Sequence, residues 1–242
     1  MKNNKLIILL LFVFTSVFSQ ENLNTSIPTD SIKTTADSLI AKVNRNKWSI
    51  EVGTGVSNGT TPYSEGYYNS MDNQLFKGFI FNCYTVGASY KFSEIVGLKM
   101  DLAFDRFSND EETKSKPFEI AQYRMSIQAV FNLNSFIRPV NNVSRSNILF
   151  HGGLNVAVMY PIAAKDETVV YKYDGYGGTV FGITPILKVS KKTSIFLDVS
   201  YYNNYLQVLT WDGQKNPAGN SKQGHMYSVT FGLSFALDAD KK

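Results

Sequence analysis

The 242-residue sequence is poor in the residues that build several common kinds of site. Cys83 is the only cysteine, so an internal disulfide and a cysteine-based zinc cluster are both excluded. Charged residues make up 18% of the chain, with 24 basic against 20 acidic side chains. This near balance provides no strongly basic surface, so we expect no nucleic-acid partner. Beyond residue 18 no apolar run reaches the roughly 18 residues of a membrane-spanning helix, which excludes a helical membrane protein.

The N-terminus has the pattern of a secretory signal peptide. Lys2 and Lys5 precede the apolar run 6–18, and the sequence becomes polar at Ser19. The run is shorter than a bilayer-spanning helix, and no cysteine follows it to carry a lipid anchor. We therefore predict that residues 1–20 are a cleaved signal peptide and that the mature protein is exported without lipidation. Loss of the two lysines leaves 22 basic against 20 acidic residues.

Residues 21–47 are polar and contain no aromatic side chain. Apolar residues recur within them at helical spacing, after a Pro-Thr-Asp-Ser start, which makes a short amphipathic helix near 30–44 plausible. We predict a periplasmic extension, which is either a docking element or a marginal helix on a solvated linker. The apolar positions of this pattern are Ile32, Ala36, Leu39, Ile40 and Val43.

From Trp48 to Leu237 the pattern changes to strict alternation, and 17 Phe, 14 Tyr and 17 Gly accompany it. Alternation of this kind predicts β-strands with one apolar and one polar face. Eight such runs can be counted, which places both ends of the sheet on one side of a closed barrel. The runs begin at or near Trp48, Cys83, Val96, Ala121, Ile148, Phe181, Ile195 and Tyr227.

The apolar faces of these strands indicate contact with lipid rather than with a protein core. Through the central part of every strand, that face carries no Asp, Glu, Lys, Arg or His. A lysine or arginine facing lipid at mid-membrane costs roughly 2 to 4 kcal/mol, so lipid selects against them. The opposite face is mostly Gly, Ser, Thr, Ala, Asn and Gln, and aromatic residues gather near the strand ends. We predict an all-β fold: an eight-stranded antiparallel transmembrane β-barrel in the outer membrane, with outer-membrane lipid around it and a short N-terminal periplasmic extension.

The connections follow from this arrangement. With a periplasmic N-terminus, segments 58–75, 108–117, 161–177 and 203–223 lie outside, and 93–94 and 190–192 are short periplasmic turns. Two features depart from the pattern: segment 134–146 is long for a periplasmic turn, and Pro185 removes a ladder hydrogen bond from within a strand.

Residues 48–237 resemble the family of small, porin-like, eight-stranded outer-membrane β-barrel domains, which includes barrels accessory to secretion. The resemblance implies assembly by the barrel-assembly machinery. Such barrels often end on an aromatic residue, and here Phe235 is followed by Ala236, Leu237 and a polar tail, residues 238–242.

Alternation places a set of charged side chains on the inward face, at several heights. They could form an ion path or an internal salt-bridged plug; an eight-stranded barrel is just wide enough to be filled by side chains, which favours the plug. Asp101 and Arg124 lie on adjacent strands, and we predict that they pair directly. The predicted lumen network consists of Glu51, Lys99, Asp101, Arg124 and Asp198, with His151 and Lys188 on the same face.

Nothing in the sequence assembles a catalytic constellation. His225 and Ser228 fall on opposite faces of one strand, and His151 has no evident acid and nucleophile beside it. We expect no enzymatic activity, no cofactor and no metal.

The outer segments are rich in tyrosine interleaved with Asn, Gly and Ser, which is the composition of an adaptable binding surface. The alternative is aromatic anchoring with ordinary loop packing. Two functions therefore stay open: a structural or surface-binding barrel with a protein or glycan ligand at its outer loops, or an accessory subunit of a secretion or transport complex engaged through residues 21–47. A passive channel is a third class, for which we expect little conductance. The loop candidates are Tyr67, Tyr68, Tyr171, Tyr173, Tyr176 and Trp211.

Overall fold

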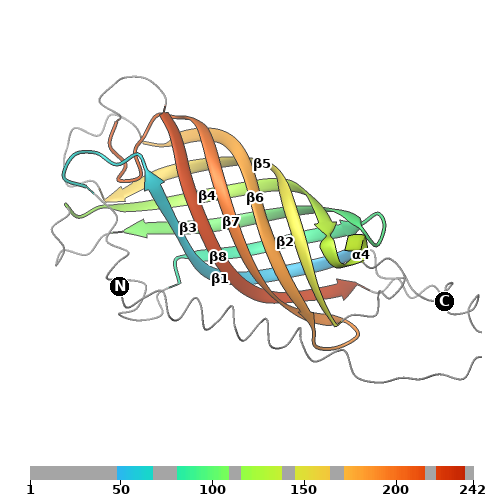
Figure 1. Ribbon diagram of the computed structural model, residues 1–242. Coiled ribbons are helices and arrows are strands. Elements are labelled where there is room, and N and C mark those ends of the chain that lie inside the picture. Colours follow the sequence, from blue (N-terminus) through green and yellow to red (C-terminus); the bar gives the residue numbers. More distant parts are fainter. Residues whose placement is uncertain are drawn as a thin grey trace, which may run out of the picture. The chain divides into compact units, whose positions relative to one another are not determined.

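The computed structural model describes residues 48–67, 81–108, 116–137, 145–163, 172–215 and 222–237. Eight antiparallel strands form a closed barrel in which each strand pairs with the next and β8 pairs with β1 (Figure 1). This confirms the predicted all-β, eight-stranded antiparallel fold. The predicted signal peptide 1–20, extension 21–47 and tail 238–242 lie outside the described residues. The elements are β1 (Trp48–Thr61), β2 (Cys83–Lys91), β3 (Val96–Ser108), β4 (Glu119–Asn132), α4 (Leu133–Ile137), β5 (Ser146–Ala163), β6 (Asp174–Lys188), β7 (Thr193–Gln207) and β8 (Lys222–Leu237).

Among the described residues, no helix combines the length and the apolarity needed to cross a membrane.

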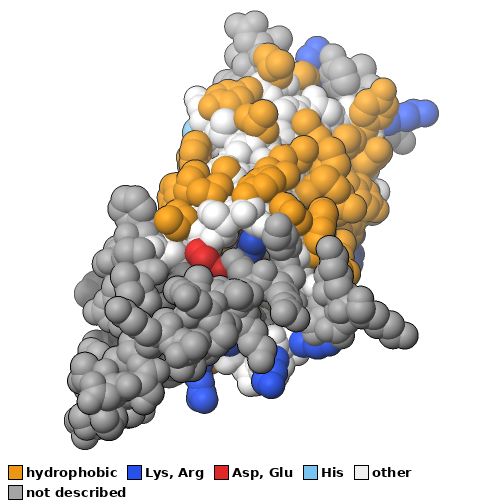
Figure 2. All heavy atoms as spheres, turned by 90° about the vertical axis from the view of Figure 1, so that its right-hand side faces the viewer, with side chains coloured by type: hydrophobic (Ala, Val, Ile, Leu, Met, Phe, Trp, Pro, Cys, Tyr) orange, Lys and Arg blue, Asp and Glu red, His pale blue; other side chains and the backbone are white. Residues whose placement is uncertain are grey.

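The period-two pattern sorts side chains between the two faces of the wall. Outward positions carry large exposed apolar side chains, such as Val52, Leu102 and Leu154, which are 52%, 49% and 69% exposed. Inward positions carry mostly buried polar ones, such as Gln122 and Ser228. Figure 2 shows apolar side chains gathered on the outer wall of the barrel. A sheet whose exposed side is apolar and whose edges are all paired meets both requirements for crossing a bilayer.

Connections divide the barrel into two ends. The β2–β3 and β6–β7 connections are tight turns, closed by hydrogen bonds from Phe92 N–H to Val96 C=O and from Val189 N–H to Thr193 C=O. Both lie at the end where β1 begins and β8 finishes, which we call the inner end. The opposite, outer end carries the β1–β2, β3–β4, β5–β6 and β7–β8 connections, and in outer-membrane barrels this end faces the outside.

The structure accounts for both departures from the sequence pattern. Pairing between β6 and β7 stops at Ile183–Val199 and resumes at Ile186–Phe196, so Pro185 lies where the ladder is open. Part of segment 134–146 forms the short helix α4, and Asn134 ties it to β5 by donating to Ser146 C=O and accepting from Ile148 N–H. The helix that follows β4 is therefore held against the start of β5.

Candidate functional site: the closed barrel interior

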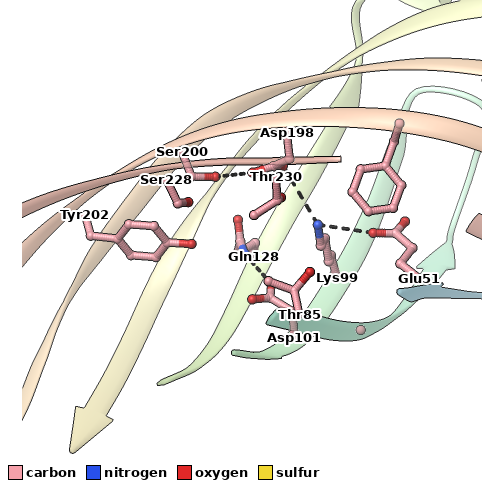
Figure 3. Close-up of a pocket in the computed structure, with 12 residues that line it drawn as sticks. Glu51, Thr85, Lys99, Asp101, Gln128, Asp198, Ser200, Tyr202, Ser228 and Thr230 are labelled. Atoms are coloured by element: carbon pink, nitrogen blue, oxygen red, sulfur yellow. Dashed lines mark hydrogen bonds and ion pairs between the residues drawn. The ribbon is translucent and has the colours of Figure 1, made fainter. Parts of the chain in front are cut away.

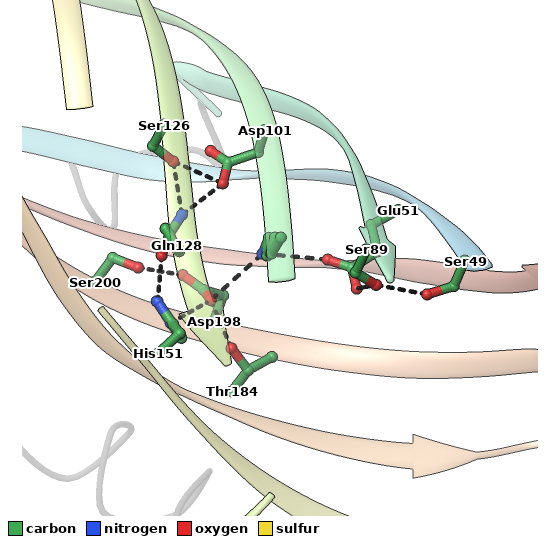
Figure 4. Close-up of polar contacts among 11 residues, drawn as sticks. Ser49, Glu51, Ser89, Asp101, Ser126, Gln128, His151, Thr184, Asp198 and Ser200 are labelled. Atoms are coloured by element: carbon green, nitrogen blue, oxygen red, sulfur yellow. Dashed lines mark hydrogen bonds and ion pairs between the residues drawn. The ribbon is translucent and has the colours of Figure 1, made fainter. Parts of the chain in front are cut away.

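A buried carboxylate organises the inner half of the lumen. Asp198, on β7, accepts hydrogen bonds from Thr184 Oγ1 at 2.7 Å and from Ser200 Oγ at 2.5 Å. His151 Nε2 lies 3.0 Å and Lys99 Nζ 3.9 Å from its Oδ2 (Figure 4). These donors come from β3, β5, β6 and β7, so one side chain joins four strands across the lumen.

Lys99 extends the network to the first two strands. Its Nζ is 3.1 Å from Glu51 Oε2 on β1, and the Phe196 ring lies 5.9 Å from the same ammonium group (Figure 3). Ser89 Oγ, on β2, donates to Glu51 at 3.4 Å and shares a 2.6 Å hydrogen bond with Ser49 Oγ. Both acids therefore have a cation and a hydroxyl donor within the wall, which offsets part of the cost of burying them.

Asp101 enters the same network through amide and hydroxyl groups. Its Oδ2 accepts from Ser126 Oγ at 2.8 Å and from Gln128 Nε2 at 2.5 Å. Gln128 Oε1 lies 2.5 Å from His151 Nδ1, which connects Asp101 to Asp198 through one amide and one imidazole. Four of the five predicted lumen residues, Glu51, Lys99, Asp101 and Asp198, therefore lie in one connected set.

The predicted pair between Asp101 and Arg124 is wrong. Arg124 instead binds Asp105, with Nε 2.7 Å from Oδ2 and Nη2 3.2 Å from Oδ1. Arg124 pairs in the ladder with Ala103, so Asp101 and Asp105 are equally near in register. The guanidinium lies toward the outer end, where its Cζ is 4.1 Å from the Tyr202 ring centre and Nη2 is 3.8 Å from Cys83 Sγ.

The structure changes the predicted set of lumen residues at two positions. Asp105 was not singled out, although alternation put it on the same face as Asp101; its burial is complete. Lys188, predicted to face the lumen, lies exposed at the inner end of β6.

An apolar cluster fills the lumen above the Arg124–Asp105 pair. At its centre the Trp211 indole is completely buried, and it contacts the rings of Phe107 and Tyr176 at centroid distances of 5.3 and 6.5 Å. We call this cluster the outer plug. Its buried members are Phe107, Phe118, Ile120, Ala157, Met159, Tyr176, Val180, Tyr202, Leu209, Trp211 and Met226.

The β7–β8 connection supplies the centre of this plug by folding into the barrel. A register shift follows Asn204, and Leu206 adopts a positive φ of 64°, which redirects the chain inward. Asp174 Oδ2 accepts from the backbone N–H groups of Val208 and Leu209, both at 2.8 Å. Hydrogen bonds to buried carboxylates hold the inward course of the segment.

The first residues of the β1–β2 connection, 62–67, lie against the same segment. Trp211 donates from its backbone N–H to Pro62 C=O and from Nε1 to Thr61 C=O, at 2.9 and 2.7 Å. Asp212 Oδ1 accepts from Ser64 N–H at 2.8 Å. Burial, reinforced by the Asp212 charge, raises the pKa of the Tyr63 phenol in this connection. A side chain on Gly59 would overlap the indole, so glycine at this position makes room for the plug.

The loop candidates from the sequence divide into three groups. Tyr176 and Trp211 are not surface residues, because both are buried in the outer plug; for them the prediction is wrong. Tyr173 is 64% exposed, and half-buried Tyr67 lies beside Lys116, whose Nζ is 5.3 Å from its ring centre. Tyr68 and Tyr171 lie outside the described residues.

The site offers little space and no reactive pairing. A small cavity beside Lys99, Asp198 and Tyr202 has room for about one or two water molecules. The imidazole of His151 faces Gln128 and Asp198, and Ser200 donates to Asp198 instead of to the histidine. Within the described part of the chain, no group of three or more His, Cys, Asp or Glu could hold a metal ion. The geometry therefore serves to bind the strands to one another.

The sequence matches no protein-family model and no curated protein. Among solved structures, Neisserial surface protein A is 9% identical with a TM-score of 0.47, and the match covers 78% of this chain and 97% of that one. OprG from Pseudomonas aeruginosa is 9% identical with a TM-score of 0.45, over 81% and 97%. A major outer membrane protein from Thermus thermophilus is 10% identical with a TM-score of 0.45, over 79% and 99%.

Identities of this size concern the fold alone, and the chain's own surfaces define its setting. Its outer wall is apolar, as contact with lipid requires, and every described strand is paired on both sides. The interior is polar in its inner half and apolar in its outer half. The chain is an eight-stranded outer-membrane β-barrel whose lumen is closed by its own side chains.

Proposed function

We propose that this protein is a non-conducting scaffold that acts at the cell surface, by binding a protein or glycan ligand with its outer connections. The observation that carries the proposal is the double closure of the lumen. The outer plug blocks the outer half, and charged pairs and the Asp198 network block the inner half.

The outer plug and the charged network would each oppose the passage of an ion through the lumen. The indole of Trp211 has no exposed surface, so water has no path past the centre of the plug. Directly below, Arg124 and Asp105 are at most 4% exposed and are bound to each other. An ion would have to displace a compensated charge from a low-dielectric interior, which is unfavourable.

The proposal includes the absence of catalysis. The interior carboxylates and the histidine are engaged with one another, and the only cysteine, Cys83, is buried beside Arg124. This arrangement supports a structural use of the polar residues and leaves recognition to the outer surface. Tyr173 is the most exposed of the described loop candidates and is the first residue to test.

Two measurements test the proposal. In planar lipid bilayers, the mature wild-type protein should give no stepwise conductance; a stable ohmic channel would rule out the non-conducting role. On an array of oligosaccharides and cell-surface proteins, Tyr173→Ala should weaken binding of any ligand retained by the wild type. Trp48→Ala, at the inner end, is the matched control because it removes an aromatic ring of similar exposure, 54% against 64%. If neither the array nor Tyr173→Ala shows an effect, the binding role is rejected.

A further inference from the structure

One sector of the outer wall is polar where the wall of β3, β4 and β5 is aromatic. Outward positions at mid-wall on β7 and β8 are apolar, including Val199, Val229 and Phe231, which are 47%, 39% and 46% exposed. Toward the outer end, the outward positions change to phenols, amides and an imidazole. We call this set the β7–β8 shelf; it consists of Tyr201, Asn203, Tyr205, Gln223 and His225.

Hydrogen bonds hold the shelf side chains in place before any ligand binds. Tyr201 Oη lies 2.7 Å from His225 Nδ1, and the two rings are stacked at an interplanar angle of 18°. Gln223 Nε2 donates to Asn203 Oδ1 at 2.6 Å, and Asn203 Nδ2 donates to Tyr205 Oη at 3.0 Å. These groups are ordered among themselves although they face outward, which lowers the entropy cost of binding.

The neighbouring strand leaves space beside the shelf. Tyr205 pairs across the ladder with Gly177, and Gly175 is the next outward position on β6. A Cβ built on Gly175 would have no atom within 4 Å. One flank of the Tyr205 ring therefore borders bare backbone, where a flat ring can approach it.

The opposite wall carries different chemistry. Toward the outer end of β3, β4 and β5 the outward side chains are Phe104, Tyr123 and Tyr160, in contact at centroid distances of 5.2 and 6.1 Å, and beyond them lies the ion pair of Arg106 and Glu119. This row has the composition of an ordinary aromatic girdle. Aromatic rings are sufficient for anchoring at the membrane boundary. Anchoring therefore does not explain the clustered amides and imidazole of the shelf.

We infer that the β7–β8 shelf binds the sugar headgroup of an outer-leaflet glycolipid. The shelf lies immediately beyond the apolar belt, so a ligand there has one end among headgroups and the other in hydrocarbon. Amides and phenols both donate and accept, as hydroxyl-rich sugars require, and an aromatic ring offers a surface for stacking. No member of the shelf carries a fixed charge, which favours sugar hydroxyls over a phosphate group. The inference goes beyond the scaffold role and does not depend on it.

The experiment uses the mature protein in nanodiscs, with lipopolysaccharide or phosphatidylglycerol as the added lipid and free core oligosaccharide as a soluble comparison. The shelf variant combines Asn203→Ala, Gln223→Ala and His225→Ala. The control is Tyr123→Ala, which removes a 55% exposed ring from the opposite wall. Gel mobility with and without boiling verifies that each variant is folded.

Wild type should bind lipopolysaccharide more tightly than phosphatidylglycerol or the free oligosaccharide. The folded shelf variant should bind it about tenfold more weakly, as expected for the loss of two or three hydrogen bonds, while the control stays within about twofold of wild type. Equal binding by the shelf variant and wild type would overturn the inference. Equal retention of phosphatidylglycerol would overturn the sugar specificity, and equally tight binding of free oligosaccharide would overturn the assignment to a lipid.

Discussion

A single arginine inside the barrel binds both oxygens of one carboxylate, and this geometry determines what each substitution there should do. Arg124 and Asp105 are both buried, and no water layer separates them. Removing one partner from such a pair leaves an uncompensated charge in the interior, whereas removing both leaves none.

Arg124→Leu should therefore lower the free energy of unfolding by about 3 to 5 kcal/mol, and the double variant Asp105→Asn/Arg124→Leu should recover a large part of that loss. Urea unfolding in detergent micelles, followed by tryptophan fluorescence, measures both. Asp101→Asn/Arg124→Leu is the matched control, because Asp101 binds Ser126 and Gln128 instead. Recovery in this control and not in the Asp105 double variant would refute the pairing.

The exposed pair at the outer rim provides a second comparison. Arg106 and Glu119 are in contact, but their side chains are 57% and 26% exposed. Neutralising both should cost less than about 1 kcal/mol, because solvent screens them.

Alternation in the sequence was sufficient to predict that Glu51, Lys99, Asp101, Arg124 and Asp198 face the lumen. It did not determine partners, because two acids on β3 are equally near Arg124 in register. The choice depends on the direction in which the guanidinium leans, which is fixed by Tyr202 and Cys83 from two other strands. Contacts between strands far apart in the sequence leave no periodic signal.

At the scale of one element, the β7–β8 connection behaves as part of the core. Its pattern is not alternating, so the sequence indicated an outer loop over 203–223. Residues up to Gln207 continue β7, and Leu209 and Trp211 then enter the lumen. Asp174, at the start of β6, holds this course, and Asp212 of the connection itself accepts from Ser64 in the β1–β2 connection. These contacts join segments far apart in the sequence, and no local pattern marks them.

Loosening this element should expose the barrel's single thiol. Cys83 is completely buried below the plug, and a thiol reacts only where the reagent can reach it. In Trp211→Ala, labelling of Cys83 by a small maleimide should accelerate by about tenfold or more, since truncating a buried tryptophan leaves a large cavity. The measurement is the labelling rate by mass spectrometry, on protein that gel mobility identifies as folded.

Trp48→Ala serves as its control, because Trp48 lies outward at the inner end. Its labelling rate should equal that of wild type. If Trp211→Ala labels as slowly as wild type, the indole is not the barrier above Cys83.

At the scale of the whole molecule, the strands share one orientation: their apolar side chains face outward and most of their polar side chains face the lumen. This much the sequence predicted fully, because a period of two can be read from each strand by itself. Strand order and closure followed from the requirement that no edge stays unpaired in lipid. The plug could not be predicted in this way, since it depends on how two separate outer connections meet.

A charge placed on the outer wall tests the orientation directly. Leu102 points outward from the middle of β3, so Leu102→Arg should lower the free energy of unfolding in lipid vesicles by about 2 to 4 kcal/mol. Phe92→Arg, in the turn at the inner end, should cost less than about 1 kcal/mol because the charge reaches the interface. Equal costs at the two positions would contradict the placement of the apolar belt in lipid.

The inward fold of residues 208–215 also bears on how this barrel could be engineered. A polar stretch of connection at the outer end is where one would graft an epitope for display on a cell. Here the backbone of that stretch is fixed by Asp174 and by Thr61 and Pro62, and its side chains fill the lumen. A foreign peptide inserted within it would be pushed against packed rings. The insertion would therefore disrupt the packing that closes the lumen, and the epitope would not be displayed to an antibody.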